Sequence, residues 1–87
     1  MKIDFSEKFR RKLKKIYRRD RQLYQKSLDS LDKLKYQPDS PSLKLHKLKG
    51  FKKAMWSFSI TGDIRILAAF TKTGILLTDI GSHDEVY

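Results

Sequence analysis

The chain has 87 residues, which suffice for a single domain, residues 1–87, with one modest core. It contains no cysteine, so it offers neither a disulfide framework nor a thiolate metal site. No apolar run approaches the roughly 20 residues needed to span a bilayer, and the first residues do not resemble a signal peptide. We therefore expect a soluble, cytoplasmic protein.

The formal net charge is +10, and the charge is unevenly distributed along the chain. Residues 1–53 hold 18 of the 20 Lys and Arg residues but only 6 of the 10 Asp and Glu residues, whereas residues 54–87 are nearly neutral and rich in apolar residues. A basic half joined to an apolar half indicates a polyanion-binding surface built on a β core. This distribution favours a nucleic-acid partner over a charged surface that serves only solubility.

The first half of the chain predicts one short strand followed by two helices. Residues 2–5 alternate polar and apolar, which is typical of a strand. Ser6 and Asp20 are suitable N-caps for two consecutive helices, and Pro38 lies in the loop that ends the second. The short link between the helices predicts an antiparallel hairpin. The expected apolar stripes are Phe9, Leu13, Ile16 and Tyr17, then Leu23, Tyr24, Leu28, Leu31 and Leu34.

The second half predicts a small antiparallel sheet. Leu43 and Leu45 alternate with Lys44 and His46, which predicts an extended segment that leads to residues 47–50. Three strands follow, around residues 56–60, 64–70 and 75–80, separated by turns that contain glycine. Two helices followed by antiparallel strands predict an α+β fold with two layers.

Four polar side chains are candidates for chemistry near the sheet. The two histidines of the chain are His46, among lysines before the sheet, and His83, which follows the last strand. Histidine is the side chain best suited to proton transfer near neutral pH. Asp63, in a turn, is a carboxylate that could orient an imidazole. Arg65 is expected on the polar face of its strand, where it could bind phosphate.

Each of these residues also has a purely structural explanation. An isolated exposed histidine usually contributes only polar surface, and Asp63 fits a simple turn residue. Arg65 also fits an ion pair across the sheet with Asp79 or Asp63. A tryptophan such as Trp56 is more often an anchor of the core than a platform on which a base stacks. Tyr87, as the last residue, could equally belong to a frayed end.

Three segments carry a resemblance to a known family. They are residues 45–50 (LHKLKG), 56–67 (WSFSITGDIRIL) and 79–87 (DIGSHDEVY). With these segments the chain resembles the RelE/ParE toxin superfamily, and within it most closely the YafQ-type mRNA interferase toxins. The resemblance implies a two-layer RelE-like fold in which an N-terminal helical hairpin packs on a small, mainly antiparallel sheet. It also implies the toxin of a type II toxin–antitoxin system, an endoribonuclease that cuts mRNA on the ribosome and is blocked by an antitoxin.

The resemblance places catalytic residues at His46, Asp63, His83 and Tyr87, which match the family's two histidines, its aspartate and its C-terminal aromatic residue. Arg65, which many relatives share, is expected to neutralise phosphate charge. The residues expected to bind RNA are Arg11, Lys15, Lys47, Lys49, Lys52 and Lys53, with Lys47 or Lys49 assisting Arg65.

The chain departs from the YafQ-type pattern at three positions. Ser59 replaces another histidine, Asp79 replaces an arginine, and Ile64 replaces the tryptophan that usually follows the aspartate. These departures concern mainly how phosphate charge is neutralised.

The implied reaction needs no metal or cofactor, because the ribose 2′-hydroxyl can attack its own 3′ phosphate when one group removes its proton and another protonates the leaving 5′ oxygen. We expect His46 to act as base, with Asp63 assisting, and His83 as acid, although the two histidine roles can be exchanged. Arg65 would stabilise the charge of the transition state, and Tyr87 would stack on or position the nucleotide.

Other functions fit parts of the sequence. A ParE-type gyrase-inhibiting toxin would share the fold, but such relatives generally lack paired histidines at positions 46 and 83. A non-enzymatic basic nucleic-acid-binding module explains the basic helices but not the polar cluster around His83. A membrane-surface role for the first helix conflicts with the use of its apolar stripe as core. The expected partners are therefore mRNA, the ribosome and an antitoxin whose acidic segment could cover the basic region.

Overall fold

The computed structural model describes residues 2–50 and 54–87, so Lys52 and Lys53, two of the residues expected to bind RNA, lie outside the described residues. The chain forms β1 (Lys2–Phe5), α1 (Glu7–Arg19), α2 (Arg21–Tyr36), a 3₁₀ turn η1 (Pro41–Leu43), β2 (His46–Lys47), β3 (Trp56–Ser59), β4 (Ile64–Phe70), β5 (Gly74–Ser82) and α3 (His83–Val86).

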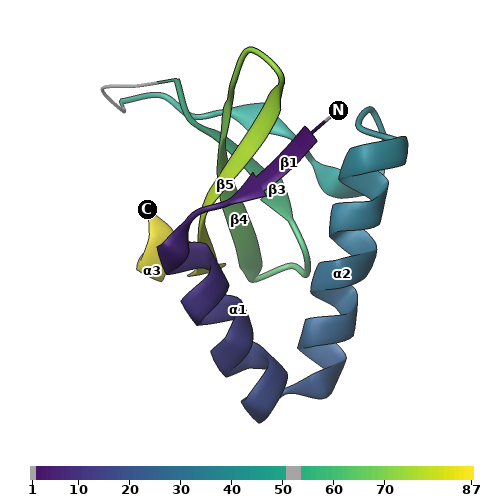
Figure 1. Ribbon diagram of the computed structural model, residues 1–87, viewed down its shortest axis with the longest axis vertical. Helices are drawn as coiled ribbons and strands as arrows, with labels where there is room; N and C mark the ends of the chain where they lie inside the picture. Colours follow the sequence, from purple (N-terminus) through teal and green to yellow (C-terminus); the bar gives the residue numbers. More distant parts are fainter. Residues whose placement is uncertain (1, 51–53) are drawn as a thin grey trace.

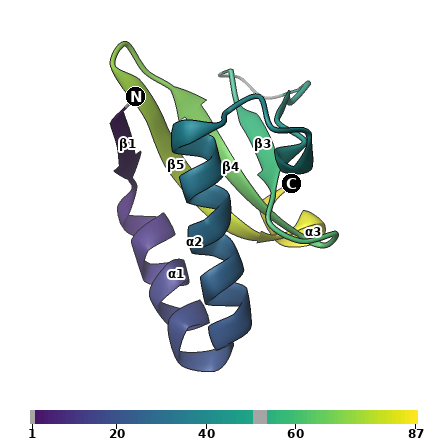
Figure 2. The same ribbon diagram turned by 90° about the vertical axis from the view of Figure 1, so that its right-hand side faces the viewer.

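The two long helices begin where the sequence places their caps. The Ser6 side chain accepts a hydrogen bond from the backbone N–H of Phe9 at 3.0 Å, and the Asp20 carboxylate accepts one from Leu23 at 3.0 Å. Each cap satisfies an amide that would otherwise lack a partner in the first turn. Only Asp20 separates the helices, so they run antiparallel beside each other (Figure 2). Both cap predictions and the hairpin are confirmed.

The sheet has five strands in the order β1-β5-β4-β3-β2. Strands β2 to β5 pair antiparallel with their neighbours, and β1 pairs parallel with β5. In the sequence, α1 and α2 separate β1 from the other strands. In the sheet, β1 is the edge strand beside β5. The predicted α+β class, with a helical hairpin on a mainly antiparallel sheet, is confirmed.

The core lies between this sheet and the helical hairpin, which covers one face of the sheet (Figures 1 and 2). The buried apolar residues are Phe9, Leu31, Leu34, Leu43, Phe58, Ile66, Ala68, Ile75, Leu77 and Ile80. Most predicted stripe residues contact this core, but Tyr17 is exposed and Ser27 and Ser30 are buried among them. Trp56 is only half-buried and lies outside the core cluster, so its prediction as a core anchor was wrong.

Two segments differ from the prediction. The segment from Leu43 to His46 was expected to be extended, but Pro41, whose φ suits a helical first turn, begins a 3₁₀ turn that ends at Leu43. Lys44 then adopts the left-handed conformation (φ 50°), and the strand that follows contains only His46 and Lys47. The last strand extends to Ser82, and a one-turn helix, α3, follows it.

Candidate active site

The strands present different residues to the two faces of the sheet. Phe58, Ile66 and Ile80 are register partners, and all three belong to the core beneath the helices. Since neighbouring residues of a strand point to opposite faces, the residues between them lie on the face of the sheet opposite this core. We call this the site face. Its central residues are Ser57, Ser59, Arg65, Leu67, Asp79 and Gly81.

Helix α3 covers part of the site face, on the side of the sheet opposite α2 (Figure 1). Gly81 permits this packing, since a Cβ at that position would lie 3.2 Å from Cβ of Glu85 and 3.3 Å from Cγ1 of Val86. Ser82 caps the helix, because its side chain accepts from the N–H of Glu85 while the Glu85 carboxylate accepts from the N–H of Ser82. The capping box and the close packing at Gly81 therefore determine the positions of His83, where α3 begins, and Tyr87, which follows its end.

Tyr87 is tied to the sheet and is not a frayed end. Its hydroxyl donates a hydrogen bond to Oγ of Ser57, a buried residue of β3. Its ring contacts the His83 ring edge to face, with 4.3 Å between the centroids. The C-terminal residue therefore connects the His83 imidazole to the centre of the site face.

His46 reaches the same face from the edge strand. It pairs with Ser57 in the antiparallel β2–β3 ladder, and directly opposed residues of such a ladder project to the same face. Ser57 thus has His46 beside it and Tyr87 bonded to it, and Tyr87 contacts His83. The structure brings the two histidines to one face of the sheet, although His46 belongs to β2 and His83 to α3, after the last strand.

The hydrogen bond of the His46 ring determines which nitrogen is free. Its Nδ1 lies 2.9 Å from the carbonyl oxygen of Lys44, and a carbonyl can only accept. Nδ1 therefore carries the proton, and in the neutral ring Nε2 is left as an acceptor. The left-handed backbone of Lys44 turns this carbonyl toward the ring. The exposed imidazole of His46 therefore presents Nε2 as a hydrogen-bond acceptor.

Arg65 and Asp63 lie farther along the same β3–β4 hairpin. Arg65, half-buried, donates from Nη1 to Oγ of Ser59 at 2.7 Å, and within the described residues it forms no ion pair. The predicted ion pair of Arg65 with Asp79 or Asp63 was therefore wrong. Asp63 is exposed in the turn just before Ile64, which pairs with Ser82. Asp63 thus lies at the His83 end of the sheet, away from the β2–β3 pairing that holds His46.

Asp79 is paired instead by two lysines of α1, which sequence reasoning missed. Its carboxylate is 2.6 Å from Nζ of Lys12 and 3.2 Å from Nζ of Lys8. Burial alone would raise the pKa of Asp79, but hydrogen bonds from Lys12, Lys8 and the backbone N–H of Ile80 lower it below its usual value. The spacing of Lys8 and Lys12, one helical turn apart, showed that they share a helix face but not which strand they meet.

The remaining residues predicted to bind RNA are spread over the surface. Arg11, Lys15, Lys47 and Lys49 are all exposed. Lys47 pairs with Trp56, whose side of the sheet is the one opposite the site face, so Lys47 and Arg65 project from different faces. Lys15 lines a hollow of about 280 Å³ between α1 and the end of β5.

Among residues 2–50 and 54–87, no three His, Cys, Asp or Glu side chains gather as metal ligands would. In the same described ranges, no helix is long and apolar enough to cross a membrane.

Solved structures with this fold are bacterial and archaeal toxins. A YoeB/ParE toxin from Agrobacterium tumefaciens superposes with a TM-score of 0.81 at 22% identity, covering 95% of this chain and 99% of that chain. A metal-bound toxin from Helicobacter pylori has a TM-score of 0.75 at 28% identity, covering 100% and 99%. YafQ from Escherichia coli has a TM-score of 0.75 at 19% identity, covering 99% and 97%. No family model and no curated protein matches the sequence.

In each comparison the similarity extends over nearly the full length of both superposed chains, so the two share the fold of a whole small domain. The chain is a two-layer α+β protein with the fold of the RelE/ParE-like toxin superfamily, YafQ included, as its three sequence segments implied.

Proposed function

We propose that the chain is the toxin of a type II toxin–antitoxin system and an endoribonuclease that cuts mRNA on the ribosome. The observation that supports this most directly is the connection of His46 to His83 through Ser57 and Tyr87 on one face of the sheet. Two imidazoles on a common surface can serve as base and acid for the two ends of a phosphodiester exchange.

In the proposed reaction, Nε2 of His46 accepts the proton of the ribose 2′-hydroxyl, whose oxygen attacks the adjacent phosphorus. The bond from phosphorus to the 5′ oxygen breaks, and protonated His83 donates a proton to that oxygen. The products are a 2′,3′-cyclic phosphate and a free 5′-hydroxyl. Arg65, which has no carboxylate partner within the described residues, stabilises the charge on the phosphate oxygens.

The hydrogen bond between His46 and Lys44 supports this division of roles, because it leaves a lone pair on the outward Nε2 of His46. We assign Asp63 to His83, not to His46 as the sequence suggested; the support is that Asp63 precedes Ile64, which pairs with Ser82, the residue before His83. Tyr87 positions His83 and offers an aromatic edge to a base.

An antitoxin partner is supported by the similar structures and by charge. The E. coli DinJ–YafQ complex and the RelE–RelB complex from Pyrococcus horikoshii share this fold at TM-scores of 0.73 and 0.70. A partner segment rich in Asp and Glu would complement the net charge of +10. We propose that the protein acts in the cytoplasm, where mRNA, ribosome and antitoxin are present.

The decisive experiment adds the purified protein to translating ribosomes with a defined message and maps new 5′ ends. We expect cleavage by the wild type and none by a His46→Ala/His83→Ala double variant, since each proton-transfer group contributes roughly 10²–10⁴-fold. Tyr36→Ala, an exposed substitution far from the site face in α2, is the control and should cleave normally. An intact message with the wild type, or cleavage by the double variant, contradicts the proposal. Gyrase inhibition without cleavage would indicate the ParE-type alternative.

A further inference from the structure

An aromatic surface lies on the other face of the sheet, beyond the cover of the helices. Trp56 of β3 and Phe70 at the end of β4 pack edge to face, with ring centroids 5.4 Å apart. Phe70 is 46% exposed, and neither ring belongs to the core cluster. Figure 2 shows the β4–β5 hairpin rising past the end of α2, so among the described residues no helix covers this end of the sheet.

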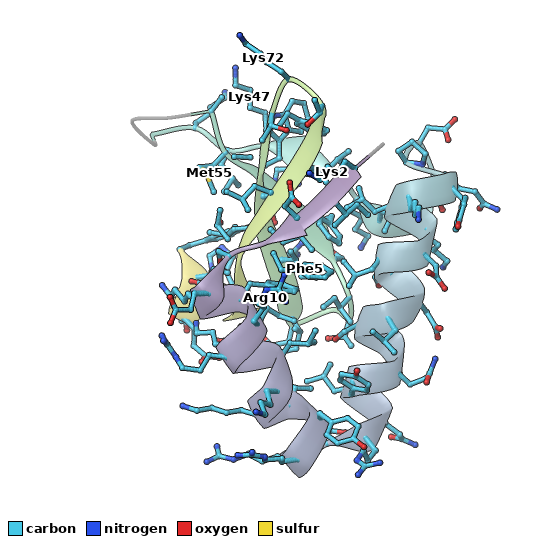
Figure 3. The ribbon with its side chains drawn as sticks, in the orientation of Figure 1. Lys2, Phe5, Arg10, Lys47, Met55 and Lys72 are labelled. Atoms are coloured by element: carbon cyan, nitrogen blue, oxygen red, sulfur yellow. The ribbon has the colours of Figure 1, made fainter. Side chains whose placement is uncertain are left out.

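Two lysines flank these rings. Lys47 is the register partner of Trp56 and therefore projects to the same face. Lys72 lies in the turn two residues after Phe70. Figure 3 shows both lysines at the same end of the molecule. Within the part of the chain that the structure describes, neither forms an ion pair. We call Lys47, Trp56, Phe70 and Lys72 the aromatic–lysine patch.

We propose that the aromatic–lysine patch binds single-stranded RNA, with a base stacked on Phe70 and Trp56 and phosphates at the two lysines. Exposed aromatic rings bind bases of any sequence through their π-faces, and adjacent cations bind the backbone. Charge complementarity favours this occupant over a protein segment: the charged groups of the patch are both positive, and a neutral apolar segment would leave them without partners.

The patch also lies where an RNA strand leaving the active site would pass. His46 and Lys47 are consecutive in β2 and project to opposite faces. Since β2 is the edge strand of the sheet, a strand crossing that edge would go from the site face at His46 to the patch at Lys47. This inference rests on the proposed function and extends it: the patch would hold nucleotides that flank the cut.

Binding can be measured without cleavage by using a single-stranded 2′-O-methyl oligoribonucleotide, which lacks the attacking hydroxyl. Trp56 is the only tryptophan of the chain, so its fluorescence reports directly on the patch. We expect the oligonucleotide to quench this fluorescence and Phe70→Ala to weaken binding roughly tenfold. Lys47→Ala/Lys72→Ala should reduce the slope of log K against log salt by about 1.4, since about 0.7 is lost per phosphate contact with a single strand.

The matched control is an aromatic–lysine pair elsewhere on the surface. Tyr36 is 72% exposed, and Nζ of Lys35 lies 5.4 Å from the centroid of its ring. Lys35→Ala/Tyr36→Ala removes the same kinds of groups at the end of α2 and should leave both affinity and quenching unchanged. Equal losses in the control and in the patch variants would show general electrostatics and overturn the proposal.

Other outcomes separate the patch from the catalytic proposal. Unchanged affinity in Phe70→Ala, with cleavage by the wild type intact, overturns only the patch. Quenching that Phe70→Ala abolishes, without cleavage of an ordinary message by the wild type, supports the patch and contradicts the nuclease. If Phe70→Ala loses binding to the antitoxin but not to the oligonucleotide, the surface is a protein-docking site and the proposal is wrong. Circular dichroism of each variant establishes that it is folded.

Discussion

Strand β3 shows in two adjacent residues how the two faces of this sheet differ. Phe58 points under the helical hairpin, is fully buried and belongs to the apolar core cluster. Ser57, the residue before it, is equally buried but points the other way, where it accepts the Tyr87 hydroxyl and lies opposite His46. One face therefore stabilises the domain, and the other positions polar groups beneath a single turn of helix.

The comparison explains how so small a domain can hold a polar site. Burying aliphatic and aromatic side chains against two long helices provides the stability. Helix α3 covers part of the site face; its capping box and the absence of a Cβ at Gly81 allow it to pack there. Substitutions on the helix-covered face should therefore change mainly stability, and those on the site face mainly activity.

The largest effect is expected from Phe58→Ala. Removing this fully buried ring leaves a cavity in the core and should lower the free energy of unfolding by about 3–5 kcal/mol. Ser57→Ala, at the next position, loses one hydrogen bond and should cost only about 1 kcal/mol. Urea unfolding of both variants measures this difference in stability. When equal amounts of folded protein are compared in the cleavage assay, Ser57→Ala should lose more activity than Phe58→Ala. Equal destabilisation would contradict the division between faces.

Asp79 is the exception on the site face, because its charge pairs with α1. Asp79→Asn should lower the free energy of unfolding by about 1–3 kcal/mol, as expected for lost hydrogen bonds to a charged group. Since the pKa of Asp79 is lower in the folded than in the unfolded chain, its stabilisation is present above the usual value of 3.8 and is lost as the pH falls through the lowered pKa.

The difference in unfolding free energy between wild type and Asp79→Asn should therefore be largest near neutral pH and should shrink as the pH falls below 3.8, through the lowered pKa of Asp79. Asp84→Asn is the matched control, since Asp84 is fully exposed and its one recorded partner is His83 at 3.7 Å. A difference that persists unchanged into acid would show that the carboxylate charge is not what stabilises the contact.

A smaller effect on stability, but a clear one on activity, is expected from Gly81→Ala. The added Cβ would approach Glu85 and Val86 within 3.2–3.3 Å, so α3 must shift by a few tenths of an ångström. We expect a loss of about 1 kcal/mol and a larger proportional loss of cleavage, because His83 and Tyr87 move with α3. Gly62→Ala is the control: a Cβ there meets nothing within 4 Å. Full activity in Gly81→Ala would show that the position of α3 is unimportant.

The sequence predicted the layers of this fold better than its contacts. Ser6 and Asp20 act through bonds within three residues, so their caps could be read directly from the chain. The alternation of Ser57, Phe58 and Ser59 likewise fixed which side of β3 is apolar. The resemblance named His46, His83 and Tyr87, but their connection through Ser57 depends on strand register, which no local pattern contains. The Lys8–Asp79 and Lys12–Asp79 pairs depend on the parallel pairing of β1 with β5, which sets the position of α1.

The smallest effect concerns the carbonyl that orients His46. Lys44 has φ 50° and ψ 42°, a left-handed conformation that costs a residue with a Cβ about 1 kcal/mol or more. Glycine avoids this cost but makes the unfolded chain more flexible. Lys44→Gly should therefore change the unfolding free energy by between zero and about +1 kcal/mol, whereas Lys44→Ala keeps the strain and should be nearly neutral. Both should keep the bond from His46 Nδ1, and with it the pH dependence of cleavage. If Lys44→Gly is clearly less stable than Lys44→Ala, the left-handed turn is not formed, and His46 loses the partner that leaves its Nε2 free to act as the base.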